Sequence, residues 1–544
     1  DGHPRPRGRA KMSTSLVAKI PGSVLDKIAD QRRLDVTAAQ AVVTEDQLRA
    51  QIAAQSPAGD FVAALQAAPM AVLAEMKRAS PSKGDIAMHV DAAQQGLTYA
   101  LAGACTISVL TEPTWFKGSL DDLRRVKTAL KEAKLSPGTC VLRKDFIIDE
   151  YQLLEARAAG ADTALLIVAI LSPTRLAELM AASRALGMEP LVEVATEGEM
   201  TVALAAKARV IGVNNRNLHT MEVDMGRTRR LAAMIPRGEG TDAPLLLALS
   251  GVSSRADVQG FAEDAAVGVL VGESLMRAAS PAGLIRELLG QPPPRTLCKV
   301  CGLRTPEAIH AATEAGADLL GMIFVPGAKR TITEAEGARM VQEVRRLRPR
   351  AADWRPPRFA PQEGGAKDEG EGGAARWLQL WRGLLMRGAQ SGGPLTVGVF
   401  VDASAAEINA VVETVGLDLV QLHGKSEGWE IAKQLSVPAV RVVHMAEDVS
   451  SAQVLGQLRG GSCAAVLLDS KGGGTGQTFD WQVGVEVQAK APFILAGGLT
   501  PDNVAAAVKQ VRPWCVDVSS GVETDGVKDI AKIQAYVRNA KAVE

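Results

Sequence analysis

Short apolar runs recur sixteen times along this chain, in two sets of eight, and helical patterns separate the runs. The first set occupies residues 73–77, 105–111, 140–146, 163–168, 190–194, 210–215, 245–250 and 267–272. The second set occupies residues 297–301, 319–325, 395–401, 417–422, 439–445, 464–469, 493–496 and 515–520. The runs are rich in Val, Ile and Leu, which is typical of parallel strands that are buried on both faces. Eight such strands that alternate with helices close into a barrel, so the sequence predicts an α/β protein of two tandem (β/α)8 TIM barrels.

The length of the chain agrees with two barrels. It has 544 residues, and one barrel of this kind needs roughly 250. We expect a tail or linker remnant at 1–12, a first barrel at 13–290, a linker at 291–296 and a second barrel at 297–544. Residues that precede the first run show helical spacing of apolar side chains, which predicts extra helices over the bottom or the rim of the first barrel. Consecutive prolines stiffen the linker.

A low-complexity insert at about 348–393 interrupts the second set of runs, where a loop of a few residues would suffice. Its first part is poor in apolar residues and rich in Gly, Pro and Glu, a composition typical of disorder. Its second part, 376–388, has Trp and Leu at helical spacing. This helix could dock onto another domain or pack on its own barrel, and we favour the second interpretation.

Composition excludes several classes of function. The 61 basic and 61 acidic side chains cancel, which argues against a nucleic-acid partner, and no apolar run is long enough to span a membrane. Six cysteines are too few for a disulfide framework, so we expect a reducing, cytoplasmic setting. The basic N-terminus lacks the apolar core of a secretory signal. It begins with Asp rather than Met, and we expect the chain to be a piece of a longer polypeptide.

Charged and amide side chains stand where runs of the first set end. Glu75 and Lys77 lie two residues apart and therefore share a face of their strand. Further runs end in or just before Lys144, Glu193, Asn214 and Arg216. The C-terminal ends of the strands carry the chemistry in this fold. We therefore expect these side chains to meet at the mouth of the barrel and to perform acid–base catalysis.

The seventh and eighth runs of the first set lead into the small residues of LSGVSS, 249–254, and VGESLM, 271–276. Small residues allow backbone N–H groups to approach an anion, and the start of a helix adds partial positive charge. Loops after strands seven and eight are the usual phosphate site of this fold. The first half is therefore predicted to bind a sugar phosphate.

The second set of runs offers a thiol and a carboxylate at two strand ends. Cys301 ends the first run and Asp469 ends the sixth. The C-x-x-C spacing of Cys298 and Cys301 could indicate a metal or redox site, but strand residues three apart point to opposite faces, so we predict no metal. A thiol with a lowered pKa can act as a base. Arg330 could bind a carboxylate or a phosphate, and small-residue loops again follow the last two runs.

The first half closely resembles indole-3-glycerol phosphate synthases in the motifs AEMKRASPSKG, SVLTEPTWFKGS, LRKDFIIDEYQ, ALLIVAIL, LVEV and IGVNNRNL, over residues 15–290. The resemblance implies closure of a ring with loss of carbon dioxide and water from 1-(2-carboxyphenylamino)-1-deoxyribulose 5-phosphate. It implies that Lys144 is the general acid for the substrate carbonyl and that Glu193 is the general base or the dehydration partner. Lys77 would pair with the substrate carboxylate or act as a second acid, with Glu75 orienting it. Substrate would also contact Ser80, Asn214, Arg216 and Ser250, and the phosphate loops would contain Gly251, Gly272, Glu273 and Ser274.

One position departs from the synthase pattern. The family commonly has a Glu immediately before the Ser of the seventh-strand motif, and this chain has Leu249 there. Two lysines and two glutamates remain, so we expect activity to survive. The alternative is that one barrel is catalytically inactive and only binds sugar phosphate. A regulatory scaffold that binds such ligands without turnover is a further alternative, and assays of each half on its own substrate distinguish them.

The second half resembles phosphoribosylanthranilate isomerases in the motifs KVCGLRTPE, FVPGAKRTI, VGVFVD, VQLHG, GGGTGQTFDW, AGGLTPDNV and DVSSGVE, over residues 297–540. The resemblance implies an Amadori rearrangement of N-(5-phosphoribosyl)anthranilate. Cys301 would be the general base that removes the C2 proton of the imine, and Asp469 the general acid that protonates the ring oxygen. Arg330 would bind the anthranilate carboxylate. The phosphate loops would contain Gly473, Gly474, Gly498, Ser520 and Gly521.

Together the two resemblances imply two consecutive steps of tryptophan biosynthesis, because the product of the second barrel is the substrate of the first. We expect neither a cofactor nor a metal, and phosphorylated anthranilate compounds as the small-molecule partners. Some fungal relatives of such a fusion carry an upstream glutamine amidotransferase domain that acts with anthranilate synthase. We expect the same domain in the full-length polypeptide here.

Overall fold

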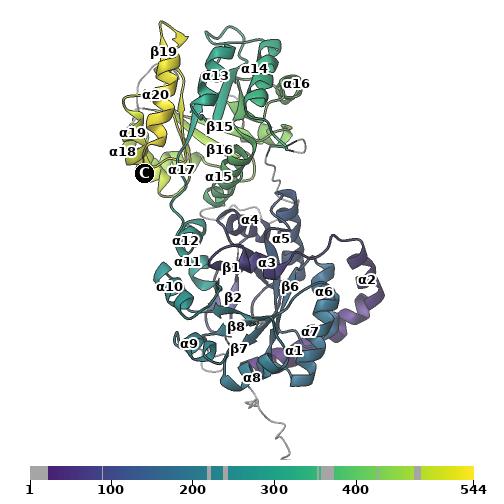
Figure 1. Ribbon diagram of the computed structural model, residues 1–544. Helices are drawn as coiled ribbons and strands as arrows, with labels where there is room; N and C mark the ends of the chain where they lie inside the picture. Colours follow the sequence, from purple (N-terminus) through teal and green to yellow (C-terminus); the bar gives the residue numbers. More distant parts are fainter. Residues whose placement is uncertain are drawn as a thin grey trace, which may run out of the picture. The chain divides into compact units, whose positions relative to one another are not determined.

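The computed structural model describes residues 23–88, 90–216, 222–236, 243–351, 354–356, 373–424, 428–446, 448–470 and 480–543. The chain divides into two compact units, Asp1–Gln291 and Pro292–Glu544. Each unit is built around its own closed barrel of parallel strands with helices around it (Figure 1). The prediction of two tandem (β/α)8 barrels is therefore confirmed.

The first barrel is closed in the order β1-β10-β9-β8-β7-β6-β5-β4. Its strands are β1 (Ala71–Met76), β4 (Thr106–Leu110), β5 (Cys140–Lys144), β6 (Thr163–Ile167), β7 (Leu191–Val194), β8 (Val210–Asn214), β9 (Leu245–Leu249) and β10 (Gly268–Val271). Each strand overlaps one of the predicted apolar runs. A short antiparallel hairpin of β2 (Ala79–Ser80) and β3 (Gly84–Asp85) follows β1.

Helices cover the outside of this barrel. They are α4 (Ala92–Leu101), α5 (Leu120–Glu132), α6 (Glu150–Ala158), α7 (Pro173–Ala185), α8 (Glu197–Ala205), α9 (Arg227–Ala232), α10 (Arg255–Glu263), α11 (Glu273–Arg277) and α12 (Pro281–Leu288), with the 3-10 turn η1 (Val168–Ile170). Many begin at a Ser, Thr or Asp whose side chain accepts a hydrogen bond from a backbone N–H of the first turn, as at Ser119, Asp149 and Ser254. Such caps satisfy the free donors at the start of a helix, and they fix where each helix begins.

Three helices precede β1, as the apolar spacing predicts. They are α1 (Val24–Val42), α2 (Glu45–Ala53) and α3 (Phe61–Gln66). Helix α1 packs against α6 and η1 and reaches the rim of the barrel mouth, where Leu25 and Ile28 line a pocket. Just before α3, the backbone N–H of Gly59 donates to Asp162 at the opposite end of the barrel. The extra helices therefore reach both the rim and the bottom.

Aspartates at strand starts tie the N-terminal ends of both barrels. Asp162, Asp318 and Asp418 each accept a hydrogen bond of 2.8–2.9 Å from a backbone N–H of the neighbouring strand. Each carboxylate also pairs with a Lys or Arg within 2.9 Å. These buried pairs lie at the end of each barrel that is opposite to the polar strand tips. We assign them to stability, because this fold places catalytic groups at the C-terminal ends of the strands.

The second barrel is closed in the order β11-β12-β13-β14-β15-β16-β17-β18. Its strands are β11 (Leu297–Val300), β12 (Leu319–Ile323), β13 (Leu395–Phe400), β14 (Leu419–Leu422), β15 (Ala439–Met445), β16 (Ala465–Ser470), β17 (Ile494–Leu495) and β18 (Cys515–Val518). A small hairpin, β19 (Glu523–Thr524) and β20 (Val527–Lys528), follows the 3-10 turn η3 (Ser520–Val522). The other elements are α13 (Pro306–Glu314), α14 (Glu334–Leu347), α15 (Gly373–Gly392), α16 (Ala405–Val415), η2 (Trp429–Gln434), α17 (Ser451–Gln457), α18 (Trp481–Gln488), α19 (Val504–Val511) and α20 (Ile530–Lys541).

Helix α15 is the helix predicted inside the insert, and it packs on its own barrel. Trp377 is 2% exposed, and its Nε1 donates to the carbonyl of Cys463 at 2.7 Å, just before β16 begins. The other end of α15 leads directly into the start of β13. The helix therefore crosses the N-terminal end of the barrel, away from the strand tips. Most of the stretch predicted to be disordered, 356–375, lies outside the described residues, but its last three residues begin α15, so the prediction is wrong for them.

Candidate active sites

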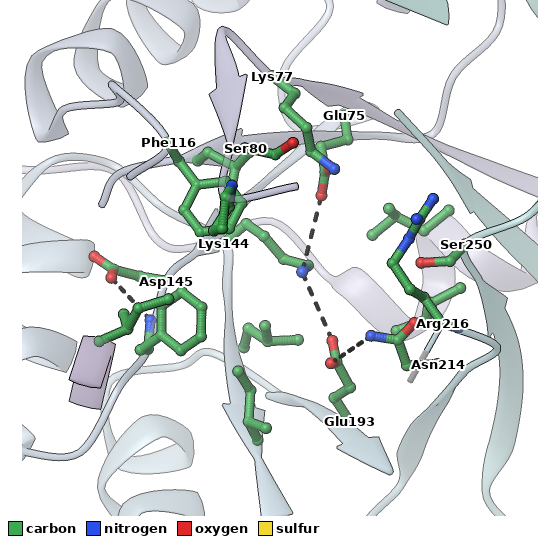
Figure 2. Close-up of a pocket in the computed structure, with 18 of the residues that line it drawn as sticks. Glu75, Lys77, Ser80, Phe116, Lys144, Asp145, Glu193, Asn214, Arg216 and Ser250 are labelled. Carbon is green, nitrogen blue, oxygen red and sulfur yellow. Dashed lines mark hydrogen bonds and ion pairs between the residues drawn. The ribbon is translucent and has the colours of Figure 1, made fainter. Parts of the chain in front are cut away.

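A pocket opens at the C-terminal ends of the strands of the first unit (Figure 2). It is lined by nine of the predicted site residues, namely Glu75, Lys77, Ser80, Lys144, Glu193, Asn214, Arg216, Ser250 and Glu273. These residues come from distant parts of the sequence, and the parallel strands bring them to one end of the barrel. The alternation of side chains along β1 places Glu75 and Lys77 on the same side, as their spacing predicts.

Lys144 lies between two carboxylates (Figure 2). Its Nζ is 3.6 Å from Oε2 of Glu193 and 3.9 Å from Oε2 of Glu75. The other oxygen of Glu75 pairs with Nζ of Lys77 at 2.9 Å. The other oxygen of Glu193 accepts a 2.9 Å hydrogen bond from Nδ2 of Asn214. Two ammonium groups and two carboxylates therefore alternate across the pocket, and Asn214 orients one of them.

This alternation sets the charge of the central groups. Burial disfavours the charged form of Lys144, but Glu193 and Glu75 outweigh it and raise the pKa of the ammonium group. Burial likewise disfavours ionised Glu75, but Lys77 and Lys144 lower the pKa of that carboxyl group. Lys144 is therefore protonated at neutral pH and can donate a proton. Among the described residues, Oε2 of buried Glu193 has only the longer contact with Lys144.

The loops after β9 and β10 come close to these charged groups. Ser250 and Gly251 have φ angles of 69° and 88°, in the left-handed region that favours glycine. A Cβ atom on Gly272 would lie 2.7 Å from Oε1 of Glu75, so a larger residue there would have to displace that carboxylate. The hydroxyl of Ser274 donates to the carbonyl of Val252 at 2.7 Å and ties the two loops together.

Arg216 and Glu273 face each other at the edge of the same loops, with NH2 of Arg216 3.6 Å from Oε2 of Glu273. Glu273 also pairs with Arg277, at 3.3 Å. Glu273 stands at the start of α11 and lines the pocket. A carboxylate at that position opposes a bound phosphate, so we expect Arg216 to carry more of any anion binding than the helix start does.

The sequence patterns missed the apolar half of this pocket. Phe116, Phe146, Leu110, Leu165 and Ile167 line the wall, and the two phenylalanine rings lie 5.9 Å apart between centroids. Side chains of α1 complete the wall. Phe146 follows Lys144 in the strand motif, which is the one signal that could have found it. The apolar residues of the strands themselves carry no such signal, because they resemble ordinary core residues.

Leu249, the departure from the synthase pattern, is 2% exposed and lines the pocket. Its side chain comes so close to Gly212 that a Cβ atom there would lie 2.7 Å from Cδ1 of Leu249. The position therefore faces the barrel interior and supplies apolar surface where a carboxylate would stand. The alternating Lys and Glu groups do not depend on it.

The second unit brings its thiol and its carboxylate to the same end of the barrel. A buried ion pair, Nζ of Lys299 to Oδ2 of Asp517 at 2.9 Å, spans neighbouring strands β11 and β18. Burial raises the pKa of Cys301, and Lys299 opposes that shift. Burial and Asp517 raise the pKa of Asp469 to about 6, and Lys299 again opposes the rise. The same ion pair therefore acts on both predicted catalytic groups.

The two cysteines of the C-x-x-C motif point to opposite sides, as predicted. Cys301 lies inside, where a Cβ atom on Gly321 of the neighbouring strand would be 2.7 Å from its Sγ. Strand alternation turns Cys298 to the other side of β11, against which α20 packs. All six cysteines are free thiols. The described residues contain no group of three or more His, Cys, Asp and Glu side chains arranged to hold a metal ion.

Arg330 is engaged by a carboxylate of its own chain. Its Nε and NH2 donate to the two carboxylate oxygens of Glu523, at 2.6 and 2.8 Å. Lys528 also contacts Glu523, at 2.9 Å, and these cations lower the pKa of Glu523 to about 2 against the effect of burial. Binding of a substrate carboxylate by Arg330 would therefore have to share the guanidinium with Glu523, a partner that sequence patterns missed.

Two histidines stand beside Asp469 and were also missed. Nε2 of His423 is 3.8 Å from Oδ2 of Asp469, and the His423 and His444 rings meet edge to face at 5.0 Å. Burial lowers the pKa of His423 to about 4, so this ring is neutral at neutral pH. His423 belongs to the motif VQLHG, and its position at a strand end could have suggested it.

The loops after β17 and β18 approach each other closely. A Cβ atom on Gly521 would lie 1.9 Å from the carbonyl oxygen of Leu499, so only glycine allows this approach. Gly498 has a φ angle of 63°, and its carbonyl accepts a hydrogen bond from Asn503 at 2.9 Å. Ser520 begins η3. Gly473 and Gly474 lie outside the described residues.

None of the helices in the described part of the chain is long and apolar enough to cross a bilayer.

Comparison with known sequences finds two family matches. The model of indole-3-glycerol phosphate synthase matches residues 25–288. The model of N-(5'-phosphoribosyl)anthranilate isomerase matches residues 385–539, and Cys301 and Arg330 lie before that range.

Similar proteins cover nearly the whole chain. A multifunctional tryptophan biosynthesis protein of Phycomyces blakesleeanus is 43% identical over 96% of this chain, which spans 70% of that protein. The tryptophan biosynthesis protein TRP1 of Phytophthora nicotianae is 41% identical over 96% of this chain and 97% of its own length. The indole-3-glycerol phosphate synthase of Roseiflexus is 42% identical over 49% of this chain and 98% of its own length.

Proposed function

Because the chain belongs to the family of multifunctional tryptophan biosynthesis enzymes, with a synthase domain followed by an isomerase domain, we propose which side chains carry its two reactions. The isomerase domain rearranges N-(5-phosphoribosyl)anthranilate, and the synthase domain closes the resulting 1-(2-carboxyphenylamino)-1-deoxyribulose 5-phosphate to indole-3-glycerol phosphate. The single observation that supports the assignment best is Lys144, held protonated between Glu75 and Glu193.

In the synthase domain, Lys144 donates a proton to the substrate carbonyl oxygen as the new carbon–carbon bond forms. Loss of carbon dioxide from the ring carbon then restores aromaticity. Glu193, whose Oε2 has no close partner among the described residues, takes the proton that the dehydration releases. Lys77 pairs with the substrate carboxylate, and Glu75 orients Lys77. Ser80, Asn214, Arg216 and Ser250 contact the substrate, and Gly251, Gly272, Glu273 and Ser274 lie at its phosphate.

In the isomerase domain, Asp469 protonates the ring oxygen of the ribose, which opens the ring to an imine. Its raised pKa, about 6, favours the protonated form that this step needs. Cys301 then removes the C2 proton; burial raises the pKa of its thiol, and the Lys299 ammonium offsets part of that rise. Arg330 binds the anthranilate carboxylate, and Gly473, Gly474, Gly498, Ser520 and Gly521 form the phosphate loops.

Product formation from phosphoribosylanthranilate tests these assignments. The wild-type chain should form indole-3-glycerol phosphate. Lys144→Ala should accumulate the rearranged intermediate, and Cys301→Ala should leave the starting compound unchanged. Lys131→Ala, a change of a solvent-facing lysine on α5, is the matched control and should behave as wild type. Full conversion by either site variant would contradict the assignment of that residue.

The same experiment separates the alternative in which one barrel only binds ligand. We further propose a cytoplasmic setting and an upstream glutamine amidotransferase domain in the full-length polypeptide that acts with anthranilate synthase. A transcript that begins near Met12 would argue against that domain on the same polypeptide.

A further inference from the structure

Helix α1 supplies part of the wall of the first pocket and is attached by one face. Its buried residues include Leu25, Ile28, Arg32 and Val36, which follow each other at steps of three or four and therefore form one stripe along the helix. Leu25 and Ile28 line the pocket. Arg32 stands one turn beyond Ile28 on the same stripe, so a cation occupies a position where an apolar residue would be expected.

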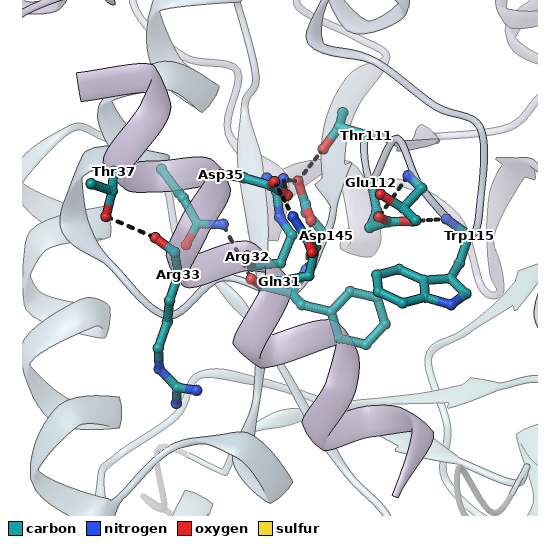
Figure 3. Close-up of polar contacts among 12 residues, drawn as sticks. Gln31, Arg32, Arg33, Asp35, Thr37, Thr111, Glu112, Trp115 and Asp145 are labelled. Carbon is teal, nitrogen blue, oxygen red and sulfur yellow. Dashed lines mark hydrogen bonds and ion pairs between the residues drawn. The ribbon is translucent and has the colours of Figure 1, made fainter. Parts of the chain in front are cut away.

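The guanidinium of Arg32 reaches Asp145 on the barrel (Figure 3). NH2 of Arg32 lies 3.0 Å from Oδ2 of Asp145, and the two side chains are 7% and 0% exposed. NH1 of Arg32 donates to Oδ2 of Asp35, one turn along α1, at 2.8 Å. One end of the planar guanidinium is therefore held by its own helix and the other by the barrel.

Asp145 is a junction of three elements, and it directly follows Lys144. Its Oδ2 also accepts from the hydroxyl of Thr111 at 2.6 Å, beyond the end of β4, and from NH2 of Arg143 on β5 at 3.0 Å. Although burial opposes ionisation, Arg143 and Arg32 lower the pKa of Asp145, so the group is a carboxylate at neutral pH. Strand alternation lets Lys144 face the pocket while its neighbour turns to α1.

We propose that Arg32 is a positioning residue for the ring closure: through Asp145 it fixes α1 against the tip of β5 and so sets the apolar wall opposite Lys144. Apolar contacts alone are not directional and would allow α1 to shift along the barrel. A forked guanidinium between two carboxylates sets both distance and direction. This inference rests on the proposed role of the first pocket as the synthase site.

Arg32→Ala in the full chain is the direct test. Asp145 keeps Arg143 and Thr111 in this variant, so no buried carboxylate is left without a partner, and the barrel should fold. We expect the KM for the rearranged intermediate to rise about tenfold, with a much smaller change in kcat, because misplacement of a binding wall weakens a well-aligned site. Arg32→Lys should recover part of the loss, because one ammonium group can reach Asp145 without spanning both carboxylates.

Arg33→Ala is the matched control. Arg33 is the next residue of the same helix, points away from the barrel (Figure 3) and pairs with exposed Asp30. Its substitution by Ala therefore removes the same charge from the neighbouring position without touching the barrel. Ile28→Ala should raise the KM as Arg32→Ala does, because Ile28 is part of the wall that Arg32 holds. The isomerase activity of the same chain, which belongs to the second unit, should be unchanged in every variant and reports the concentration of intact chains, while a melting curve reports the folding of the first unit.

The outcomes are distinct. A lower melting temperature for Arg32→Ala, with a KM equal to that of Arg33→Ala, would show a merely structural role and overturn the proposal. If the first unit of Arg32→Ala fails to fold, Asp35→Asn loosens the other end of the guanidinium without touching Asp145, and an unchanged KM there overturns it equally. Absence of synthase turnover in the wild-type chain, or full activity of Lys144→Ala, would instead contradict the function proposed for the pocket.

Discussion

Two glutamates set the pKa of Lys144. Burial alone would lower the pKa of its ammonium group, and the carboxylates of Glu193 and Glu75 reverse that shift. Sequence patterns located all three residues, because each follows a strand-like apolar run and the fold collects strand ends. They did not show that the groups alternate in charge, since the order of strands around a barrel places Glu193 and Lys144 side by side only in three dimensions.

Glu75→Gln tests that alternation. Removal of one carboxylate should lower the pKa of Lys144, so protonated Lys144 is lost at a lower pH. We expect the alkaline limb of synthase activity to move about one pH unit toward acid. At neutral pH Lys144 stays protonated, and kcat should fall about tenfold because Lys77 loses the carboxylate that orients it. The pH profile with the rearranged intermediate as substrate measures both effects. Glu178→Gln, on the exposed side of α7, should leave the profile in place, and an unmoved alkaline limb in Glu75→Gln would contradict the account.

The raised pKa of Asp469 lowers the stability of the folded second unit at neutral pH. Its pKa is raised to about 6 in the folded chain, so folding is favoured while the carboxyl is protonated, and that advantage is lost as pH rises from about 4 to about 6. Asp469→Asn should therefore stabilise the second unit by roughly 2 kcal/mol more at pH 7.5 than at pH 4.5, while it abolishes isomerase activity. Denaturant unfolding at the two pH values measures this difference, and an equal effect at both would count against it.

Sequence patterns could not predict which distant residues form ion pairs with the site residues. Arg330 was assigned as an anion binder, but Glu523, which holds it, is 193 positions away. Lys299 could have been found, because it shares a strand face with Cys301. Its pairing with Asp517 could not, since no local pattern tells which charges on distant strands meet inside a barrel.

At the level of elements, the pattern of buried strands predicted the architecture. All sixteen barrel strands overlap the apolar runs, and most boundaries differ by one or two residues. Parallel strands need no alternation of polar and apolar residues, so their runs stand out between amphipathic helices. The role of α1 escaped the same reasoning, because amphipathic spacing shows that a helix packs but not against which part of a barrel.

The contact between β11 and β12 leads to a prediction about Gly321. An added methyl group would lie 2.7 Å from Sγ of Cys301, so Gly321→Ala must displace the thiol or the strand. We expect isomerase activity to fall by at least about tenfold, with a loss of stability of about 1–3 kcal/mol, and no change in synthase activity. Gly456→Ala, on α17 with open space around it, is the control and should be neutral or slightly stabilising. Steady-state rates of both reactions, together with melting curves, decide between a local and a general effect.

At the level of the whole molecule, each barrel closes on strands of its own unit. The described lining of the synthase pocket comes entirely from the first unit. The two reactions should therefore proceed on separate chains. An equimolar mixture of Lys144→Ala and Cys301→Ala proteins should convert phosphoribosylanthranilate to indole-3-glycerol phosphate after a lag in which the intermediate builds up in solution. Product traces followed over time measure the lag, and a mixture that makes no product would mean that each unit needs an active neighbour.

Helix α15 should make the second unit tolerant of insertions in the chain that precedes it. It carries the chain back to β13 across the end of the barrel that is remote from Cys301 and Asp469. Extra sequence entering ahead of this helix is returned to the same starting point, whatever its length. Insertions at this place can therefore accumulate during evolution without disturbing catalysis. The same property makes it a suitable site for inserting a foreign peptide into the enzyme.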